Sequence, residues 1–162
     1  MKPIQSLLIL LFFSSISNAQ TEQINITIDS WHKAAEKADF ETYFDLMSKD
    51  AVFVGSDACE VWDIKEFKVF SKPYFDAGKA WTFIPVNRNV YTGRNKNIAW
   101  FDEVLNSEHM GICRGSGVLV RNQDEDWKIK HYVLSLAIPN SLVDQLVKQK
   151  TNLDNEYLKS QP

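Results

Sequence analysis

The sequence predicts one α+β domain in which a curved antiparallel sheet forms a cone around three helices from the N-terminal half, with a further helix at the C-terminus. Helical periodicity dominates residues 21–76, interrupted by a short hairpin, whereas residues 81–137 give one strand after another. About 143 residues remain after an apolar N-terminal segment, enough for one domain with a core but not for two. A cone of this kind commonly leaves a pocket between its helices and the concave face of the sheet.

The first nineteen residues, MKPIQSLLILLFFSSISNA, have the pattern of a cleavable secretory signal peptide. A basic start precedes the apolar run 7–13, and Ser17 and Ala19 occupy the −3 and −1 positions before a cleavage at Gln20. The apolar run is too short for the alternative, a retained membrane anchor. We therefore expect a secreted or periplasmic protein that does not contact the membrane after cleavage. Its domain would cover 20–150, followed by a polar C-terminal tail over 151–162.

Composition excludes several kinds of partner and site. Removal of Lys2 with the signal leaves 17 basic and 21 acidic residues without a basic block, which argues against binding to nucleic acid or to an anionic membrane. The three histidines form no local cluster, and nothing else has metal-ligand spacing, so we expect no metal and no cofactor. Cys59 and Cys113 form either a disulfide in the exported protein or two separate thiols.

Two helices are expected before the first strand. The first covers about 21–38, and Asp39 then has the place of an N-cap for a short second helix. The apolar stripe of the first helix consists of Ile24, Ile28, Trp31 and Ala35, and that of the second of Phe40, Tyr43, Phe44 and Met47.

A small hairpin and a third helix follow. A strand at 51–54 ends at Gly55, and residues 59–62 form the returning strand. Asp63 then caps a third helix that extends to about Asp76, with Gly78 behind its end. The residues expected to be buried by this helix are Phe67, Phe70 and Tyr74.

Four strands and a last helix complete the chain. Polar turns separate strands expected at about 81–91, 97–105, 110–121 and 126–137, and Pro139 ends the last of them. The segment Ser141–Asp144 predicts a capping box at the start of a C-terminal helix. The apolar residues expected to dock that helix on the domain are Leu142, Val143, Leu146 and Val147.

This order of elements, with several local strings, resembles the nuclear transport factor 2-like superfamily and, within it, the SnoaL-like domains. The strings are VGSD at 54–57 with Glu60 and Trp62, Trp81, AWFDE at 99–103, RGSGVLV at 114–120, WKI at 127–129, Ser135 and IPN at 138–140. The resemblance covers roughly 22–150 and implies the cone-shaped roll, which is also described as cystatin-like.

The resemblance leaves the function open. The same cone hosts isomerases, dehydratases, cyclases, epoxide hydrolases, oligomerisation modules and catalytically silent binding domains. Enzymes that resemble this chain work with an acidic residue or an acid–base pair deep in the cone, and none of their catalytic positions matches a motif here.

Alternation in the last strand predicts which side chains face the inside of the cone. Lys128 and Lys130 prefer solvent, so the residues between and after them should face inward. This inward set consists of Trp127, Ile129, His131, Val133 and Ser135. The alternation makes His131 the best acid–base candidate in the chain.

The stretch AWFDEVL at 99–105 places two acids side by side in a strand, so one faces inward and the other outward. Trp100 and Asp102 share one face of the strand, and we expect this face to be the inner one because Asp102 is the shorter acid. Glu103 on the inner face is the alternative. The inward acid either pairs with Arg114, faces a substrate with His131 as its acid–base partner, or lies solvated at the rim. Both faces are largely apolar, so a homodimer through the convex face of the sheet is expected.

The expected pocket gathers aromatic and polar side chains. Gly115 and Gly117 form a smooth groove, covered either by an aromatic residue from a neighbouring strand or by a ligand. Glu60 is either a rim acid or a partner for Trp81 or Arg88. The pocket residues are Trp31, Glu60, Trp62, Tyr74, Trp81, Trp100, Glu103, Arg114 and Ser116, and the aromatic ones among them serve either the core or a flat ligand.

Three functions remain open at this point. The favoured one is an exported, dimeric domain that binds a small apolar or aromatic molecule without catalysis. The second is a cofactor-independent isomerase, dehydratase or cyclase in which His131 and Asp102 transfer protons. The third is an assembly module that uses only the convex face of the sheet.

Overall fold

The computed structural model describes residues 3–94 and 96–161, with side chains from Ala19 onward except at position 95. Its elements are α1 (Pro3–Glu36), α2 (Phe40–Asp45), β1 (Met47–Val54), β2 (Val61–Asp63), α3 (Ile64–Asp76), β3 (Ile84–Thr92), β4 (Ile98–Ser107), β5 (Gly111–Arg121), β6 (Trp127–Leu136), a 3₁₀ turn (Asn140–Leu142) and α4 (Val143–Ser160). The predicted α+β class and element order are confirmed.

The predicted signal peptide lies mostly outside this description. Met1 and Lys2 are not described, and of residues 3–18 only the helical backbone of α1 is. Within the described part of the chain, no helix has both the length and the apolar character needed to cross a membrane. Cleavage before Gln20 therefore stays a prediction.

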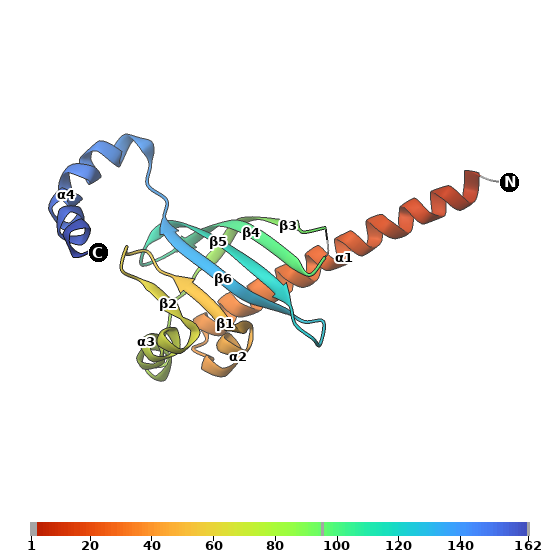
Figure 1. Ribbon diagram of the computed structural model, residues 1–162, viewed down its shortest axis with the longest axis horizontal. Helices are drawn as coiled ribbons and strands as arrows, with labels where there is room; N and C mark the ends of the chain where they lie inside the picture. Colours follow the sequence, from red (N-terminus) through yellow and green to blue (C-terminus); the bar gives the residue numbers. More distant parts are fainter. Residues whose placement is uncertain (1–2, 95, 162) are drawn as a thin grey trace.

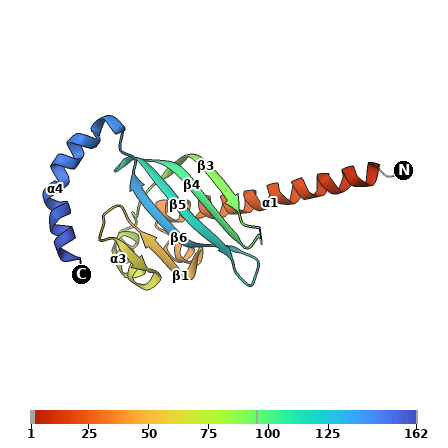
Figure 2. The same ribbon diagram turned by 45° about the horizontal axis from the view of Figure 1, so that its top comes forward.

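The six strands form one sheet in the order β2-β1-β6-β5-β4-β3 (Figure 1). All neighbouring strands are antiparallel except β1 and β6, which are parallel. The β1–β2 hairpin thus extends the main sheet, and the expectation of a purely antiparallel sheet is wrong at this one pair. Helices α1, α2 and α3 lie together on one side of the curved sheet, whereas α4 stands apart at one end of the molecule (Figures 1 and 2).

The first two helices follow their predicted patterns. All four residues of the predicted α1 stripe are buried. Asp39 caps α2, because its carboxylate accepts a hydrogen bond from the Thr42 amide at 3.1 Å. Helix α2 already ends at Asp45, so the buried Met47 begins β1 and does not belong to the helix.

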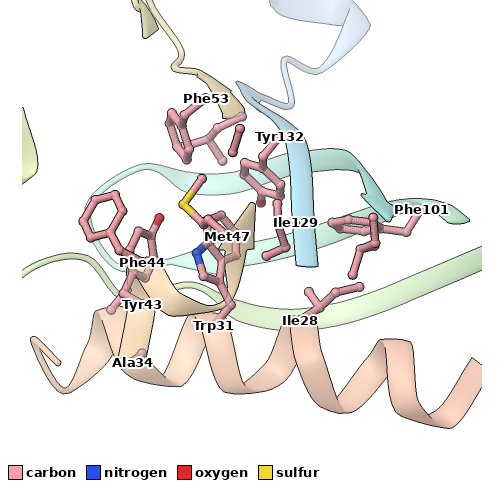
Figure 3. Packing of buried hydrophobic residues seen from close by; sticks show 14 of the residues in the cluster. Ile28, Trp31, Ala34, Tyr43, Phe44, Met47, Phe53, Phe101, Ile129 and Tyr132 are labelled. Atoms are coloured by element: carbon pink, nitrogen blue, oxygen red, sulfur yellow. The ribbon is translucent and has the colours of Figure 1, made fainter. Parts of the chain in front are cut away.

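Aromatic rings fill the concave side of the sheet (Figure 3). Trp31 of α1 stacks on Tyr43 at 4.9 Å between ring centroids and meets Tyr132 of β6 edge-on at 4.7 Å. Phe53 of β1 stacks on Phe67 of α3 at 4.1 Å. Rings of this size contribute much of the buried apolar area, and their mutual contacts stabilise the cone from the inside.

Helix α3 turns a different face to the core from the one predicted. Asp63 and Glu66 form the capping box that positions its start, and Gly78 has the positive φ of 73° expected behind its end. The buried residues are Phe67, Ser71 and Phe75, spaced four apart, whereas Phe70 and Tyr74 are 37% and 49% exposed. The predicted set and the buried set both contain Phe67 and both have helical spacing. Periodicity alone therefore does not show which of the two faces the core.

The end of the chain also differs from expectation. The Leu142 N-cap of α4 makes no side-chain hydrogen bond, so the predicted capping box at Ser141 does not form. None of the α4 residues is buried, and the expected docking of its apolar side on the domain is wrong. The helix extends to Ser160 and so includes most of the predicted polar tail. Cys59 is exposed, Cys113 is buried, and both thiols are free, so the two-thiol alternative holds.

The corrected face of α3 can be tested with two matched substitutions. Phe67→Ala should lower the free energy of unfolding by about 3–5 kcal/mol because it empties a core position. Phe70→Ala removes the same side chain from a site that is already 37% exposed, so its loss should be at least about 2 kcal/mol smaller. Urea unfolding followed by tryptophan fluorescence measures both, and equal losses would contradict this face assignment.

Candidate functional site

A β-bulge in β6 decides which of its side chains enter the cone. Val118 of β5 pairs with His131, but the next residue, Leu119, pairs with Ile129, so Lys130 is an extra residue in β6. An extra residue inverts the alternation of all later side chains. Beyond the bulge, Tyr132 and Leu134 are buried on the inner side, and His131, Val133 and Ser135 face outward. The prediction of an inward His131 is therefore wrong, while Trp127 and Ile129 face inward as expected.

Strand β4 also faces the opposite way from the favoured prediction. Phe101, Glu103 and Leu105 are buried, whereas Trp100 is 46% exposed. Asp102 lies on the outer face, where it accepts hydrogen bonds from the Asn89 side chain and the Tyr91 hydroxyl, both at 3.2 Å. The outer face thus supplies partners for Asp102, and the inner acid is Glu103.

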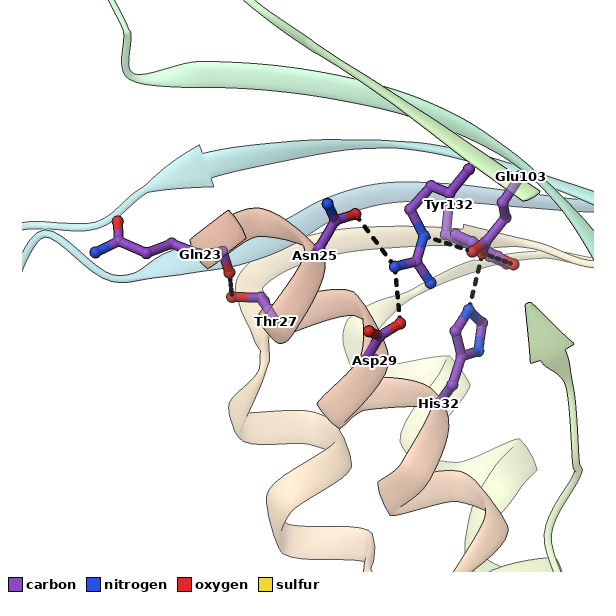
Figure 4. A network of polar contacts seen from close by, with 8 residues as sticks. Gln23, Asn25, Thr27, Asp29, His32, Glu103 and Tyr132 are labelled. Carbon is purple, nitrogen blue, oxygen red and sulfur yellow. Dashed lines mark hydrogen bonds and ion pairs between the residues drawn. The ribbon is translucent and has the colours of Figure 1, made fainter. Parts of the chain in front are cut away.

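Glu103 is 1% exposed and binds three donors from three different elements (Figure 4). Its Oε1 accepts hydrogen bonds from His32 Nε2 of α1 at 2.8 Å and from the Tyr132 hydroxyl of β6 at 3.1 Å. Its Oε2 accepts from Arg88 Nε of β3 at 2.9 Å. Together with Asp29 these four residues form what we call the inner polar cluster.

Arg88 joins Glu103 to α1. It lies directly opposite Glu103 in the β3–β4 register, and its side chain is 8% exposed. Its Nη1 donates to Asp29 at 2.7 Å and to the Asn25 side chain at 3.4 Å. Its Nη2 is buried without a hydrogen-bond partner among the described residues. One strong donor in the cluster is therefore left over.

Opposing effects act on the Glu103 carboxyl. Burial alone would raise its pKa, but the hydrogen bond from His32 and the charges of His32 and Arg88 outweigh burial, so its pKa lies below the ordinary 4.5. Burial, with the nearby Glu103 charge, raises the pKa of Tyr132 well above 10.0 and keeps its hydroxyl a donor. The cluster therefore holds an ionised carboxylate inside the domain at neutral pH.

Two glycines make room for this arrangement. A Cβ at Gly115 would lie 2.9 Å from Glu103 Oε1 and would clash with the Tyr132 hydroxyl. A Cβ at Gly117 would lie 2.7 Å from the ring of Phe101. The structure thus confirms that aromatic residues from neighbouring strands cover the predicted groove, and Gly115 allows Tyr132 to reach Glu103.

The other predicted site residues are scattered. Arg114 and Ser116 lie on the outer face, away from Glu103, and no described ion pair joins Arg114 to Asp102. Arg88 takes the place of Arg114 as the partner of Glu103. Glu60 accepts a hydrogen bond from the Asp57 amide at 3.1 Å, and no described hydrogen bond or ion pair joins it to Trp81 or Arg88. Trp31 belongs to the core, Trp62 and Trp81 are half-buried against it, and Tyr74 is exposed.

Three members of the cluster, Asp29, His32 and Arg88, had sequence signals that the prediction missed. Asn25, Asp29 and His32 are spaced four and three apart and so form a polar row on α1 beside its apolar stripe. Arg88 is the one charged residue in the predicted strand 81–91. A row and a lone charge of this kind indicate side chains that meet inside the fold.

One of the described surface hollows reaches the cluster at its edge. It lies between α1 and the start of α2, touches the cluster at Asp29, and is lined by Asp29, Ser30, Lys33, Ala34, Lys37, Asp39 and Thr42. Deeper in the cone, the space expected for a pocket holds the aromatic rings. His32 lies beneath Phe83 of the loop before β3, with 6.4 Å between ring centroids.

Comparison with known proteins adds a family and several similar folds. A family model described as SnoaL-like domain matches residues 24–139. A candidate dehydratase from the NTF2-like family of Streptomyces avermitilis has 17% identity and a TM-score of 0.65, with 76% of this chain and 99% of that chain covered. An NTF2-like protein of unknown function from Pseudomonas putida has 14% identity and a TM-score of 0.63, with coverages of 76% and 90%.

A candidate ketosteroid isomerase from Parabacteroides distasonis has 20% identity and a TM-score of 0.56, with 69% of this chain and 86% of that chain covered. At these identities the solved structures establish the shared fold alone. Comparison with curated proteins gave no match.

The lowered pKa of Glu103 predicts an acid-dependent stability. A carboxyl whose folded-state pKa is below its unfolded value of 4.5 stabilises the fold above that pH and loses this contribution as pH falls through the folded pKa. Unfolding free energy, measured from neutral pH downward, should therefore fall below about pH 4.5, and Glu103→Gln should flatten this fall. Asp102→Asn removes a carboxylate from the other face of β4, and this variant should retain the fall in unfolding free energy below about pH 4.5. An unchanged acid dependence in Glu103→Gln would contradict the assignment.

Proposed function

The chain belongs to the SnoaL-like domain family, and on that premise we propose that it is an exported, homodimeric domain that binds a small apolar or aromatic molecule without converting it. The observation that carries the binding proposal is the buried Nη2 of Arg88, which has no hydrogen-bond partner among the described residues. A buried donor left unpaired costs free energy, so a ligand acceptor at this atom would be stabilised.

The surroundings of Arg88 suit a flat molecule with one oxygen acceptor. His32 and Tyr132, which share the cluster with Arg88, make aromatic contacts with Phe83 and with Trp31. Phe83 is half-buried in the loop between α3 and β3, so movement of this loop would open a path to the cluster. A ligand entering there would place its ring among aromatic side chains and its oxygen at Arg88.

The state of Glu103 argues against catalysis. Both of its oxygens are occupied by donors, and its pKa is lowered, whereas an effective general base needs a pKa near the working pH. The catalytic pair predicted from the sequence lies outside the cone, because His131 and Asp102 are both on the outer face, on β6 and β4, with β5 between them. The geometry therefore supports holding a molecule better than moving its protons.

A proton-transfer enzyme is the second candidate, because His32 and Glu103 make a buried imidazole–carboxylate contact at 2.8 Å. Two of the solved structures with this fold are described as a candidate dehydratase and a candidate ketosteroid isomerase. Conversion of a β,γ-unsaturated ketone to its conjugated isomer, followed by ultraviolet absorbance, separates the two functions. Turnover that His32→Ala abolishes would replace the binding proposal with this one.

The packing of α1 supports the proposed export. Gln20 is buried, and its side-chain amide donates to the Lys96 carbonyl at 3.1 Å. Gln20, which would become the N-terminus after cleavage, is thus the first buried residue among the side chains that the structure describes. Removal of residues 1–19 would leave the four buried residues of the α1 stripe in place.

The outer face of the sheet supports a homodimer. Tyr91 and Trp100 stack at 5.8 Å between ring centroids and are 43% and 46% exposed. Arg114 of β5 is exposed on the same face, without a hydrogen bond or ion pair among the described contacts, and Asp102 lies on the neighbouring strand β4, as Trp100 does. A two-fold axis through this face would bring Arg114 of one copy toward Asp102 of the other, and Trp, Tyr and Arg are typical interface anchors.

The binding proposal predicts a preference between two matched probes. 2-Acetylnaphthalene carries a carbonyl acceptor and 2-ethylnaphthalene does not, so the first should bind about tenfold more tightly, as one hydrogen bond from a charged donor allows. Titration calorimetry measures both. Arg88→Lys keeps the charge but lacks Nη2 and should abolish the preference, whereas Arg114→Met should retain it. Equal binding of the two probes by the wild-type protein would refute the proposal.

The dimer proposal predicts the effect of one charge on the outer face. Trp100→Glu should raise the dimer dissociation constant at least about thirtyfold, because it places a carboxylate at the centre of the apolar face. Sedimentation velocity over a dilution series measures the constant. Thr82→Glu adds the same charge in an exposed loop and should leave the constant unchanged. A wild-type protein that stays monomeric at every concentration would remove the homodimer from the proposal.

A further inference from the structure

Helix α4 is an 18-residue helix without a buried residue. Figures 1 and 2 show it standing away from the sheet and from the other three helices. Among the described residues, one hydrogen bond joins it to the rest of the domain: the Tyr157 hydroxyl donates to the Ala58 carbonyl at 3.2 Å. An isolated helix of this length is only marginally stable in water, so α4 needs a partner that the single chain does not supply.

Four apolar residues of α4 and one lysine follow the spacing of a coiled-coil seam. They are Val143, Leu146, Lys150, Leu153 and Tyr157, separated by three, four, three and four residues. Val143, Leu153 and Tyr157 are 40%, 68% and 37% exposed, so this seam is open to solvent in the single chain. This spacing is the repeat through which helices pair in coiled coils.

We infer that α4 pairs in antiparallel orientation with α4 of a second copy of this chain. The charges along the helix select this partner and this orientation. The N-terminal half, 143–151, carries Asp144, Lys148 and Lys150, whereas the C-terminal half, 152–160, carries Asp154, Glu156 and Lys159. The first half thus has one net positive charge and the second one net negative charge. Antiparallel pairing places each half against the opposite charge and also opposes the helix dipoles.

Lys150, at the centre of the seam, is further evidence that the partner of α4 is a helix. Lys150 is flanked in the seam by Leu146 and Leu153, and its ammonium group binds the Asp154 carboxylate one turn later at 2.6 Å. A single polar residue in a coiled-coil seam specifies register and partner at some expense in stability. This surface shares no residue with the outer face of the sheet, so the pair does not depend on the dimer proposed above.

Hydrogen exchange of residues 143–160, measured by mass spectrometry over a hundredfold range of protein concentration, tests the pairing. Exchange should become at least about tenfold slower at high concentration, because pairing stabilises the helix. Leu146→Glu with Leu153→Glu should remove this protection. Gln145→Glu with Asn152→Glu adds the same charges at the same spacing on the other side of α4 and should keep it. Protection that is independent of concentration, or equal in both double variants, would overturn the inference.

Disulfide formation tests the orientation. In a Cys59→Ser background, a mixture of Leu146→Cys and Tyr157→Cys proteins should form the mixed disulfide upon oxidation, at least about tenfold above an Asn152→Cys and Gln145→Cys mixture. Antiparallel helices bring position 146 near position 157 of the other copy, whereas parallel helices bring 146 near 146. Dominance of the Leu146→Cys homodimer, or no cross-link above the control pair, would overturn the antiparallel pair.

Discussion

A carboxylate removed from water requires charged and hydrogen-bonding partners, and in this domain that requirement at Glu103 joins the layers of the fold. Its three donors come from α1, β3 and β6, so the helix, the edge strand and a central strand are all positioned by one side chain. Removal of one partner from such a group usually costs about 3–5 kcal/mol, comparable with a large core residue. The cluster therefore acts as a polar core within an aromatic one, and it specifies how α1 lies across the sheet.

Two backbone features make the cluster possible. The bulge at Lys130 turns Tyr132 inward, and Gly115 leaves the space that the Tyr132 hydroxyl and the Glu103 carboxylate occupy. Without the bulge, His131 would enter the cone, and Tyr132 would face outward. The same inversion places His131 on the outer face, which also carries Arg114 and Asp102. One extra residue in β6 thus decides which polar groups enter the cone and which lie on the outer face.

The fold was predictable because its signals are local and repeated. The stripe of Ile24, Ile28 and Trp31 and the turns between the long strands each report on their own segment, and their order suffices for the class. The site was much less predictable. The facing of His131 depends on a bulge that simple alternation does not reveal, and AWFDEVL is apolar on both sides, so parity could not separate Asp102 from Glu103. Glu103 was in the predicted pocket, whereas His32 and Arg88 come from elements whose contacts with it are set by tertiary packing.

The parallel pairing of β1 with β6 has a consequence for how the chain folds. Met47 pairs with Ile129, so the middle of the sheet joins segments from opposite ends of the domain. The chain loses conformational entropy when it closes a loop of this length, before the new contacts can stabilise the fold. Topologies of this kind therefore form slowly. During synthesis, β1 and β2 lack their main neighbour until nearly the whole domain has been translated. The nascent polypeptide would thus remain incompletely folded for most of its elongation, which is the state that the proposed export requires.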